Sequence, residues 1–528
     1  MSVLKKLVQQ TAVYGLSSII GRLLNYLLVP VYTRFFLPSE FGVVTEMYAY
    51  VAFFVVILTY GMETAFFHFS NKETKLNKNI VYTTVLSSVF ITTVLFCLIT
   101  IIKSKDISGF MGSGIQQNFV VYFAIILSLD ALNSIAFSKL RLEERPFRFA
   151  LVRLLGIITN ISFNIFFIVF EGYGIEYIFI SNLISSILTT ILLVPDFFSY
   201  KLEFNFSLWK KMIYYAFPLL VAGTAGIVNE TIDRVMLKQI HHPSKTYANY
   251  LESISDTIYV PEDLYEYDNT IICLTGKSKY RDLPSNFNQE SWCKHYANDS
   301  LIEKARLSEL GLYGAFYKIS IIMLLFIQTF RYAAEPFFFN HYKNKNNTEI
   351  YANIMKYFVI IMTVLFLISV VFYDNIISFL GEKYHDPRGF KIVSILLLAN
   401  LFLGIFFNLS IWYKLTGKTI YGAYLSLFGA AITICLNLTL IPKLGIEASA
   451  WATLACYFCM TVASYFIGRR HFYIPYDIKK ILTYIFFMII IYLLISFMAF
   501  SLITNLALLF LFMIFVTTNE YNFSSHKK

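Results

Sequence analysis

Long apolar runs follow one another almost without pause, and they limit what this chain can fold into more than any other feature. An apolar run of roughly 18 to 25 residues spans a bilayer as a helix. We place such runs at 11–33, 43–67, 80–102, 118–138, 149–170, 175–194, 212–237, 312–332, 353–373, 391–413, 420–441, 446–467, 480–500 and 502–517. The sequence therefore predicts an all-α polytopic membrane protein of about 14 transmembrane helices. For the last pair a re-entrant hairpin is the alternative, because Ser501–Asn505 is the only polar break.

Basic residues gather in alternate loops, which sets the expected orientation. With the N-terminus taken as cytoplasmic, the cytoplasmic segments hold most of the Lys and Arg, including Arg141, Lys211, Lys414 and Arg469. The opposite short loops hold only Arg34, Lys103, Lys105, Lys383, Arg388, Lys391 and Lys443. This positive-inside bias predicts that both termini are cytoplasmic. It also accounts for the net charge of +10 by contact with anionic headgroups, so we expect no nucleic-acid partner.

Two regions of the chain resemble each other, and six predicted spans separate them. The first copy contains Thr33–Leu37, Gly42 and Glu63–Phe67, and the second contains Asp233–Leu237, Gly311 and Glu335–Phe339. An even number of spans keeps the orientation, so the copies form parallel repeats about an axis along the membrane normal. We expect two pseudo-symmetric six-helix lobes plus two C-terminal helices. Their ranges are 1–200 for the N-terminal lobe, 205–470 for the C-terminal lobe and 475–520 for helices 13 and 14.

The second copy carries an insertion. Arg34 and Gly42 are eight positions apart, whereas Arg234 and Gly311 are 77 apart. The extra segment, about 241–309, is acidic and rich in Tyr and Trp, and the topology places it outside the cytoplasm. Two interpretations stay open: a small cap that stacks on sugar rings, or a variable loop. Cys273 and Cys293 lie in it, and their separation permits a disulfide without proving one.

Short motifs follow one another along the chain at Gly15–Arg22, Pro30–Gly42, Asp233–Arg234, Gly311–Lys318 and Phe330–Phe339. In this order they resemble those of the oligosaccharide flippases of the multidrug/oligosaccharidyl-lipid/polysaccharide (MOP) exporter superfamily, the Wzx-like transporters of bacteria. The resemblance implies a substrate, an undecaprenyl-pyrophosphate-linked oligosaccharide of O-antigen, capsule or exopolysaccharide. It also implies alternating access between two lobes, a multi-pass location in the bacterial inner membrane and contact with glycan polymerase machinery. The insertion departs from the short loop expected of this family.

Basic and amide side chains inside or at the ends of spans are the expected substrate contacts, because an ionisable group in a span usually faces a bundle interior or an aqueous cavity. A guanidinium also offers paired hydrogen bonds to phosphate. The candidates for pyrophosphate and sugar binding are Arg22, Asn25, Arg153, Asn160, Asn164, Lys318 and Arg331. For Arg22 a structural pair between helices is an equal alternative, for Arg153 and Arg331 a positive-inside anchor, and for the two asparagines of helix five a helix-joining role.

Carboxylates within spans are the expected coupling or gating groups. They are Asp130, Glu230, Asp233, with its neighbour Arg234, and Glu63 and Glu335 at equivalent positions of the two repeats. A buried carboxylate can exchange a proton or bind a cation, so H⁺ or Na⁺ coupling is expected and no other cofactor or metal. Fixed ion pairs with Arg22 or Arg234 are the alternative for the deep acids, and an inner latch with a nearby basic residue is favoured for Glu63 and Glu335.

Enzymatic functions find little support, because the chain has no phosphate-cradling Gly-rich loop, metal-spaced His/Cys cluster or nucleophile elbow. We therefore expect a transporter and not an enzyme. Two alternatives remain: an ion-coupled multidrug/cation antiporter of the same superfamily, and a membrane glycan polymerase or ligase that would use Arg281 and His295 of the insertion. The sequence does not determine the sugar, the coupling ion or the oligomeric state.

Overall fold

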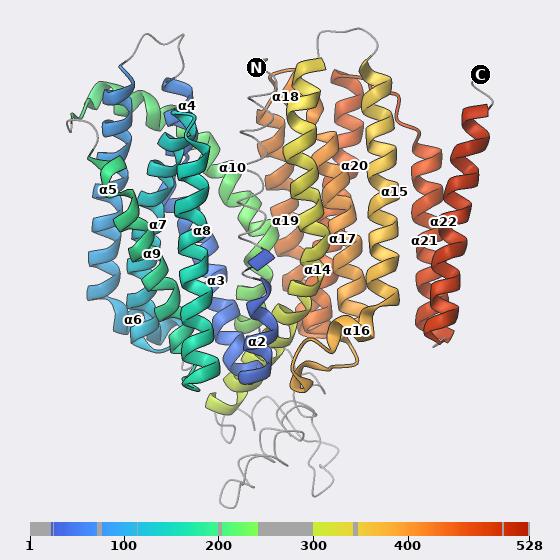
Figure 1. The fold of residues 1–528 in the computed structure, drawn as a ribbon, viewed down its shortest axis with the longest axis horizontal. Coiled ribbons are helices and arrows are strands. Elements are labelled where there is room, and N and C mark those ends of the chain that lie inside the picture. Colours follow the sequence, from blue (N-terminus) through green and yellow to red (C-terminus); the bar gives the residue numbers. More distant parts are fainter. Residues whose placement is uncertain are drawn as a thin grey trace, which may run out of the picture. The chain divides into compact units, whose positions relative to one another are not determined.

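A computed structural model describes residues 23–24, 26–70, 77–112, 115–198, 203–240, 299–341, 347–498 and 501–525. Every regular element in these ranges is a helix (Figure 1). The chain divides into two compact units, which we describe separately. The first unit is Met1–Ala315 with Ala430–Ser449, and the second is Phe316–Gly429 with Ala450–Lys528.

Most helices of the first unit come from the N-terminal half of the chain. They are α2 (Leu28–Phe35), α3 (Pro38–Thr59), α4 (Met62–Phe69), α5 (Lys78–Ile102), α6 (Ser104–Met111), α7 (Gln117–Leu142), α8 (Pro146–Asn164) with a π-helix (Ile165–Phe170), α9 (Glu176–Phe197) and α10 (Phe206–Gln239). Within this unit α7 packs against both α5 and α9, and α10 packs against α3 and α4. The shared core includes Met62, Tyr82 and Met212, each at most 1% exposed.

The long helix α14 (Asp299–His341) begins in the first unit and continues into the second. The remaining helices are α15 (Asn347–Val371), α16 (Tyr373–Ile377), a 3₁₀ turn (Glu382–Tyr384), α17 (Gly389–Leu409), α18 (Ile411–Leu415), α19 (Ile420–Leu444), α20 (Ile446–His471), α21 (Ile478–Met498) and α22 (Leu502–Ser525). In the second unit α15 contacts α17 on one side and the C-terminal pair α21 and α22 on another.

The described part of the chain has 13 helices long and apolar enough to cross a membrane. They coincide with 13 of the 14 predicted spans, so the predicted fold class is confirmed. The remaining predicted span, 11–33, lies mostly outside the described residues, which include its end in α2. The final pair appears as two separate spans, Ile478–Met498 and Leu502–Glu520, instead of a re-entrant hairpin.

Two features differ in detail from the sequence-based expectation. Helix α14 already begins at Asp299, so the last part of the predicted insertion is the start of a long helix. Ala305 and Leu310 are fully buried there, which gives this stretch one apolar face beneath its acidic residues. Helix α10, which the repeat assigns to the C-terminal lobe, packs on α3 and α4. The lobe ranges derived from the repeat stay a prediction.

Candidate functional site

A pocket in the second unit brings two basic side chains together, and we call it the basic pocket. Residues of α14, α17 and α18 line it: Phe330, Arg331, Ala334, Phe338, Phe407, Asn408, Ser410, Ile411 and Lys414. Its empty space, including the part open to solvent, is about 240 Å³. The guanidinium of Arg331 lies 4.0 Å from the ring centre of Phe407. A cation at this distance is attracted to the face of the ring, which helps to fix its position.

The chemistry of the basic pocket favours an anion. Asn408 donates its amide to the carbonyl of Gly404 at 3.2 Å, and Ser410 donates its hydroxyl to the carbonyl of Phe407 at 2.6 Å. The charged groups that line the pocket are Arg331 and Lys414, and both are cationic. A guanidinium offers a planar fork of donors and an ammonium a compact charge, and both bind phosphate oxygens.

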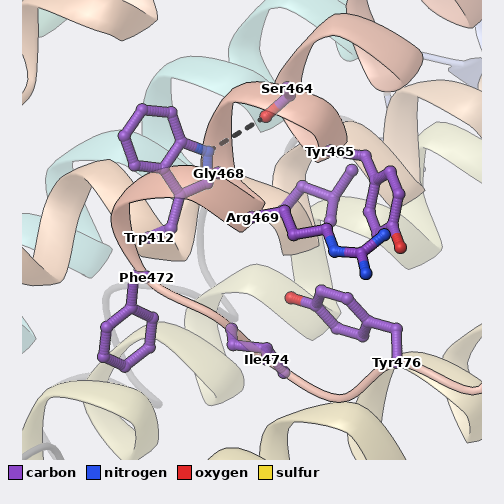
Figure 2. Close-up of a pocket in the computed structure, with 9 residues that line it drawn as sticks. Trp412, Ser464, Tyr465, Gly468, Arg469, Phe472, Ile474 and Tyr476 are labelled. Atoms are coloured by element: carbon purple, nitrogen blue, oxygen red, sulfur yellow. Dashed lines mark hydrogen bonds between the residues drawn. The ribbon is translucent and has the colours of Figure 1, made fainter.

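A second pocket, which we call the aromatic pocket, also includes residues of the segment 407–414. It is lined by Leu409, Trp412, Ser464, Tyr465, Gly468, Arg469, Phe472, Ile474 and Tyr476. Figure 2 shows the Arg469 side chain beside the rings of Tyr465 and Tyr476. The indole of Trp412 donates to the Ser464 hydroxyl at 3.3 Å. Burial raises the pKa of Tyr476 well above its ordinary value, so its hydroxyl stays protonated at neutral pH.

Asp130 belongs to a group of polar side chains inside the first unit, which we call the N-terminal polar cluster. The Ser186 hydroxyl of α9 donates to Asp130 of α7 at 2.8 Å. One helical turn along, Thr190 donates to the side-chain oxygen of Asn133 at 3.1 Å. Arg153 of α8 is close enough to act on Asp130 electrostatically. A carboxylate with hydroxyl, amide and guanidinium neighbours has the groups needed to exchange a proton or hold a small cation.

The two asparagines of α8 join helices. Asn164 is fully buried, accepts a hydrogen bond from Tyr32 of α2 at 2.9 Å, and donates to the side chain of Asn160 at 2.9 Å. Immediately after Asn164 the helix changes to the π-helical segment Ile165–Phe170. The structure thus gives Asn164 a bridging role between α2 and α8, and sugar binding by this pair stays a prediction.

Acids near the predicted cytoplasmic ends of the first unit are paired with arginines. Arg141 donates to Glu63 at 3.1 Å, so this pair joins α4 to α7 within one repeat copy. Arg148 donates to Asp196 at 2.7 Å, and Asp196 is 3% exposed. A latch role for Glu63 stays a prediction. The side chain of Glu335 lies outside the described part of the structure.

Asp233, Arg234, Glu230 and Lys318 are found in different surroundings. Asp233 is buried and accepts hydrogen bonds from the Tyr313 hydroxyl at 2.5 Å and from the backbone N–H of Arg234 at 2.8 Å. Glu230 and Lys318 have exposed side chains. Asp233 is thus held at a helix contact of the first unit, between α10 and α14, where Arg234 and Glu230 are close enough to act on it electrostatically.

Sequence reasoning missed two groups and named others that the structure does not describe. The missed groups are Glu46 of α3 and Lys238 of α10, which form a buried ion pair at 2.8 Å. Glu46 was detectable as a carboxylate within a predicted span. Lys414, which lines the basic pocket, was noted in the sequence only as a cytoplasmic basic residue. Arg22, Asn25, Cys273 and Cys293 lie outside the described residues.

Solved structures of membrane transporters share this fold. The lipid II flippase MurJ in an inward closed conformation aligns with a TM-score of 0.63 and 14% identity, covering 96% of this chain and 98% of that one. An inward-facing multidrug resistance MATE transporter of the MOP superfamily aligns with a TM-score of 0.60 and 12% identity, covering 87% of this chain and 94% of that one. A MOP superfamily transporter from Pyrococcus furiosus aligns with a TM-score of 0.53 and 11% identity, covering 87% of this chain and 95% of that one. At these identities the likeness concerns the fold.

The chain is a multi-pass membrane protein whose fold resembles that of these transporters. Residues 7–252 match the family described as polysaccharide biosynthesis protein. Comparison with curated proteins gave no match. The family match over the N-terminal part and the shared fold together confirm the predicted resemblance to the MOP exporter superfamily. Assignment to its Wzx-like branch stays a prediction.

Proposed function

We propose that this protein flips a pyrophosphate-linked oligosaccharide on a polyprenyl lipid from the cytoplasmic to the outer leaflet of a bacterial inner membrane. The observation that carries the proposal is that Arg331 and Lys414 line one pocket. Both residues belong to segments that the charge bias assigns to the cytoplasmic side. A pocket with two cations at that side is where a pyrophosphate group would first be met.

The surroundings of the basic pocket suit a lipid-linked substrate. Phe330, Phe338, Phe407 and Ile411 supply apolar walls beside the two cations. Such a combination pairs charge recognition of the phosphates with burial of adjoining apolar atoms. A cationic drug would meet like charge in this pocket, which favours the anionic lipid over a drug substrate. No step of this proposal requires covalent chemistry, so we propose a transporter and not an enzyme.

The N-terminal polar cluster supplies a candidate for energy coupling. Asp130 lies within the span Gln117–Leu142 and accepts its hydrogen bond from Ser186. A carboxylate there exchanges a proton or a sodium ion as the protein cycles, while Arg153 balances the negative charge. In this proposal the two termini face the cytoplasm, and the glycan is handed to polymerase machinery on the outer side.

The test is transport of a fluorescent undecaprenyl-pyrophosphate oligosaccharide in reconstituted vesicles. We compare the intact protein with Arg331→Ala, Lys414→Ala and the control Arg470→Ala, whose exposed side chain lines neither pocket. Each pocket variant is expected to lose transport by about tenfold or more, since a charge-assisted contact to phosphate contributes roughly 1.5–3 kcal/mol. Arg22→Ala tests the sequence-based candidate in the same assay.

Two results would contradict the proposal. If intact protein leaves the lipid where it was but expels a cationic dye under an ion gradient, the antiporter is correct. If transport occurs and both pocket variants match Arg470→Ala, the flippase function stands but the basic pocket is not its binding site. Asp130→Asn in the presence and absence of a pH or sodium gradient then tests coupling separately.

A further inference from the structure

Glu46 and Lys238 form an ion pair that is shielded from solvent on all sides. The ammonium of Lys238 lies 2.8 Å from Glu46, and the two side chains are 5% and 0% exposed. They come from α3 and α10, 192 positions apart in the sequence. Breaking a buried pair leaves uncompensated charge, which costs several kcal/mol when one partner is removed. Separating these two side chains therefore requires a large free energy.

The ammonium of Lys238 also contacts α6 and α14. It donates to the backbone carbonyl of Met111 at the end of α6, and it lies 3.4 Å from Glu303 near the start of α14. The neighbouring Gly112 has a φ of +115°, and a Cβ there would meet the Glu303 carboxylate at 2.2 Å. One side chain thus holds the adjoining ends of α6, α10 and α14 to α3.

A close helix crossing lies beside the ion pair. A Cβ on Gly42 of α3 would come within 1.9 Å of the Leu307 carbonyl oxygen of α14, and one on Gly314 within 2.4 Å of the Thr45 hydroxyl. The two backbones are therefore in direct contact, with no space for water between them. Crossing and ion pair together close this end of the first unit.

The contacts at this end of the first unit join the two predicted copies of the sequence repeat. Helix α3 belongs to the first copy, whereas α10 and the first part of α14 belong to the second. Both contacts therefore join one copy to the other, at the end that carries the insertion. A carrier that releases its substrate on this side has to separate the copies here.

We propose that the Glu46–Lys238 ion pair is a lock that keeps the outer end of the two repeats closed, and that the pair breaks when this end opens. The proposal rests on the proposed transport function, because only an alternating carrier needs such an opening.

Local hydrogen exchange of the full protein in lipid nanodiscs tests the lock without a transport assay. Peptides covering 38–50 and 303–315 report on the crossing, and peptides within 117–142 report on the rest of the first unit. In Glu46→Gln the first group is expected to exchange about tenfold or more faster, because exchange follows the opening equilibrium and a lost buried pair shifts it by at least that factor. The second group should stay unchanged.

A second single variant keeps the test decisive if Glu46→Gln folds poorly. Lys238→Met removes the ammonium, leaves the buried Glu46 without its ion-pair partner and should show the same local acceleration. Asp106→Asn is the matched control, since it breaks the exposed Lys103–Asp106 pair in the first unit. Unchanged exchange at 38–50 in both variants, or equal acceleration of all peptides, would overturn the lock. If exchange responds as expected but intact protein moves no lipid, the proposed substrate fails and the lock stands.

Discussion

Gly42 of α3 and Gly311 of α14, which occupy equivalent positions in the two sequence repeats, meet each other in the folded chain. A Cβ on Gly311 would lie 3.0 Å from the backbone nitrogen of Gly42 and 1.9 Å from the carbonyl oxygen of Pro38. Only glycine fits at such a distance. A pseudo-twofold axis passing between the two predicted copies would produce a contact of this kind, and the repeat itself stays a prediction.

Gly311→Ala is expected to destabilise the protein strongly. Its Cβ would overlap the Pro38 carbonyl, and because that atom is backbone the two helices have to move apart. Overpacking of this kind typically costs about 1–3 kcal/mol or more. The midpoint of thermal unfolding in detergent should fall by several degrees. Gly226→Ala is the control, because a Cβ at this position of α10 would meet no atom within 4 Å. Equal midpoints for the two variants would contradict the crossing.

Asp196→Asn is expected to weaken the first unit. The buried carboxylate accepts two hydrogen bonds from Arg148, at 2.7 and 3.0 Å, and the amide would lose the charge that holds them. We expect a loss of about 2 kcal/mol, discounted because Arg148 is one-third exposed. Thermal unfolding measures it against Asp106→Asn, whose exposed pair should contribute less than about 1 kcal/mol. A smaller effect for Asp196 than for Asp106 would count against this role.

Glu520→Gln should loosen the C-terminal helices from α15. Glu520 of α22 accepts hydrogen bonds from Lys356 of α15 at 2.5 Å, and from Lys480 and Tyr484 of α21 at 3.1 and 2.7 Å. Loss of the carboxylate removes the charge shared by both lysines, at a cost of about 2 kcal/mol. Limited proteolysis in the segment 472–477, between α20 and α21 and close to Lys480, should become faster. Glu349 of α15 is exposed and supplies the control Glu349→Gln. Equal cleavage of both variants would refute this role of Glu520.

The stability contributed by Asp386, which lies between two membrane spans, is expected to depend on pH. Burial alone would raise the pKa of its carboxyl, but hydrogen bonds and charge from Arg388, at 2.8 and 2.9 Å, outweigh burial and hold the pKa below 3.8. A lowered folded-state pKa means that the pair stabilises the protein above about pH 4, and that this contribution is lost as the pH falls through the folded-state value. Asp386→Asn should therefore unfold at lower temperature than the intact chain at pH 7, with the difference shrinking below pH 4. A difference that stays constant over this range would contradict the assignment.

The membrane spans could be predicted from the sequence because their cause is local. Each apolar run has to satisfy its own backbone hydrogen bonds in lipid, and a helix does so without help from distant residues. The observed spans, such as Lys78–Ile102 and Gly389–Leu415, therefore begin and end within a few residues of the predicted ones. The predicted orientation and the predicted repeat rest on residues that can be counted along the chain, and both stay predictions.

The candidate sites depend on which helix faces meet, and that is decided by tertiary packing. Arg331 was predicted alone, and only the fold places Lys414, 83 positions later, in the same pocket. Asp130 was predicted from its depth, yet its neighbour Ser186 comes from another helix. Glu46 and Lys238 are each an isolated charge in the sequence, and burial against one another is what makes them an ion pair. The apolar runs of the sequence were enough to determine the helices. The rotation and crossing of those helices in the tertiary structure decided which polar groups are partners.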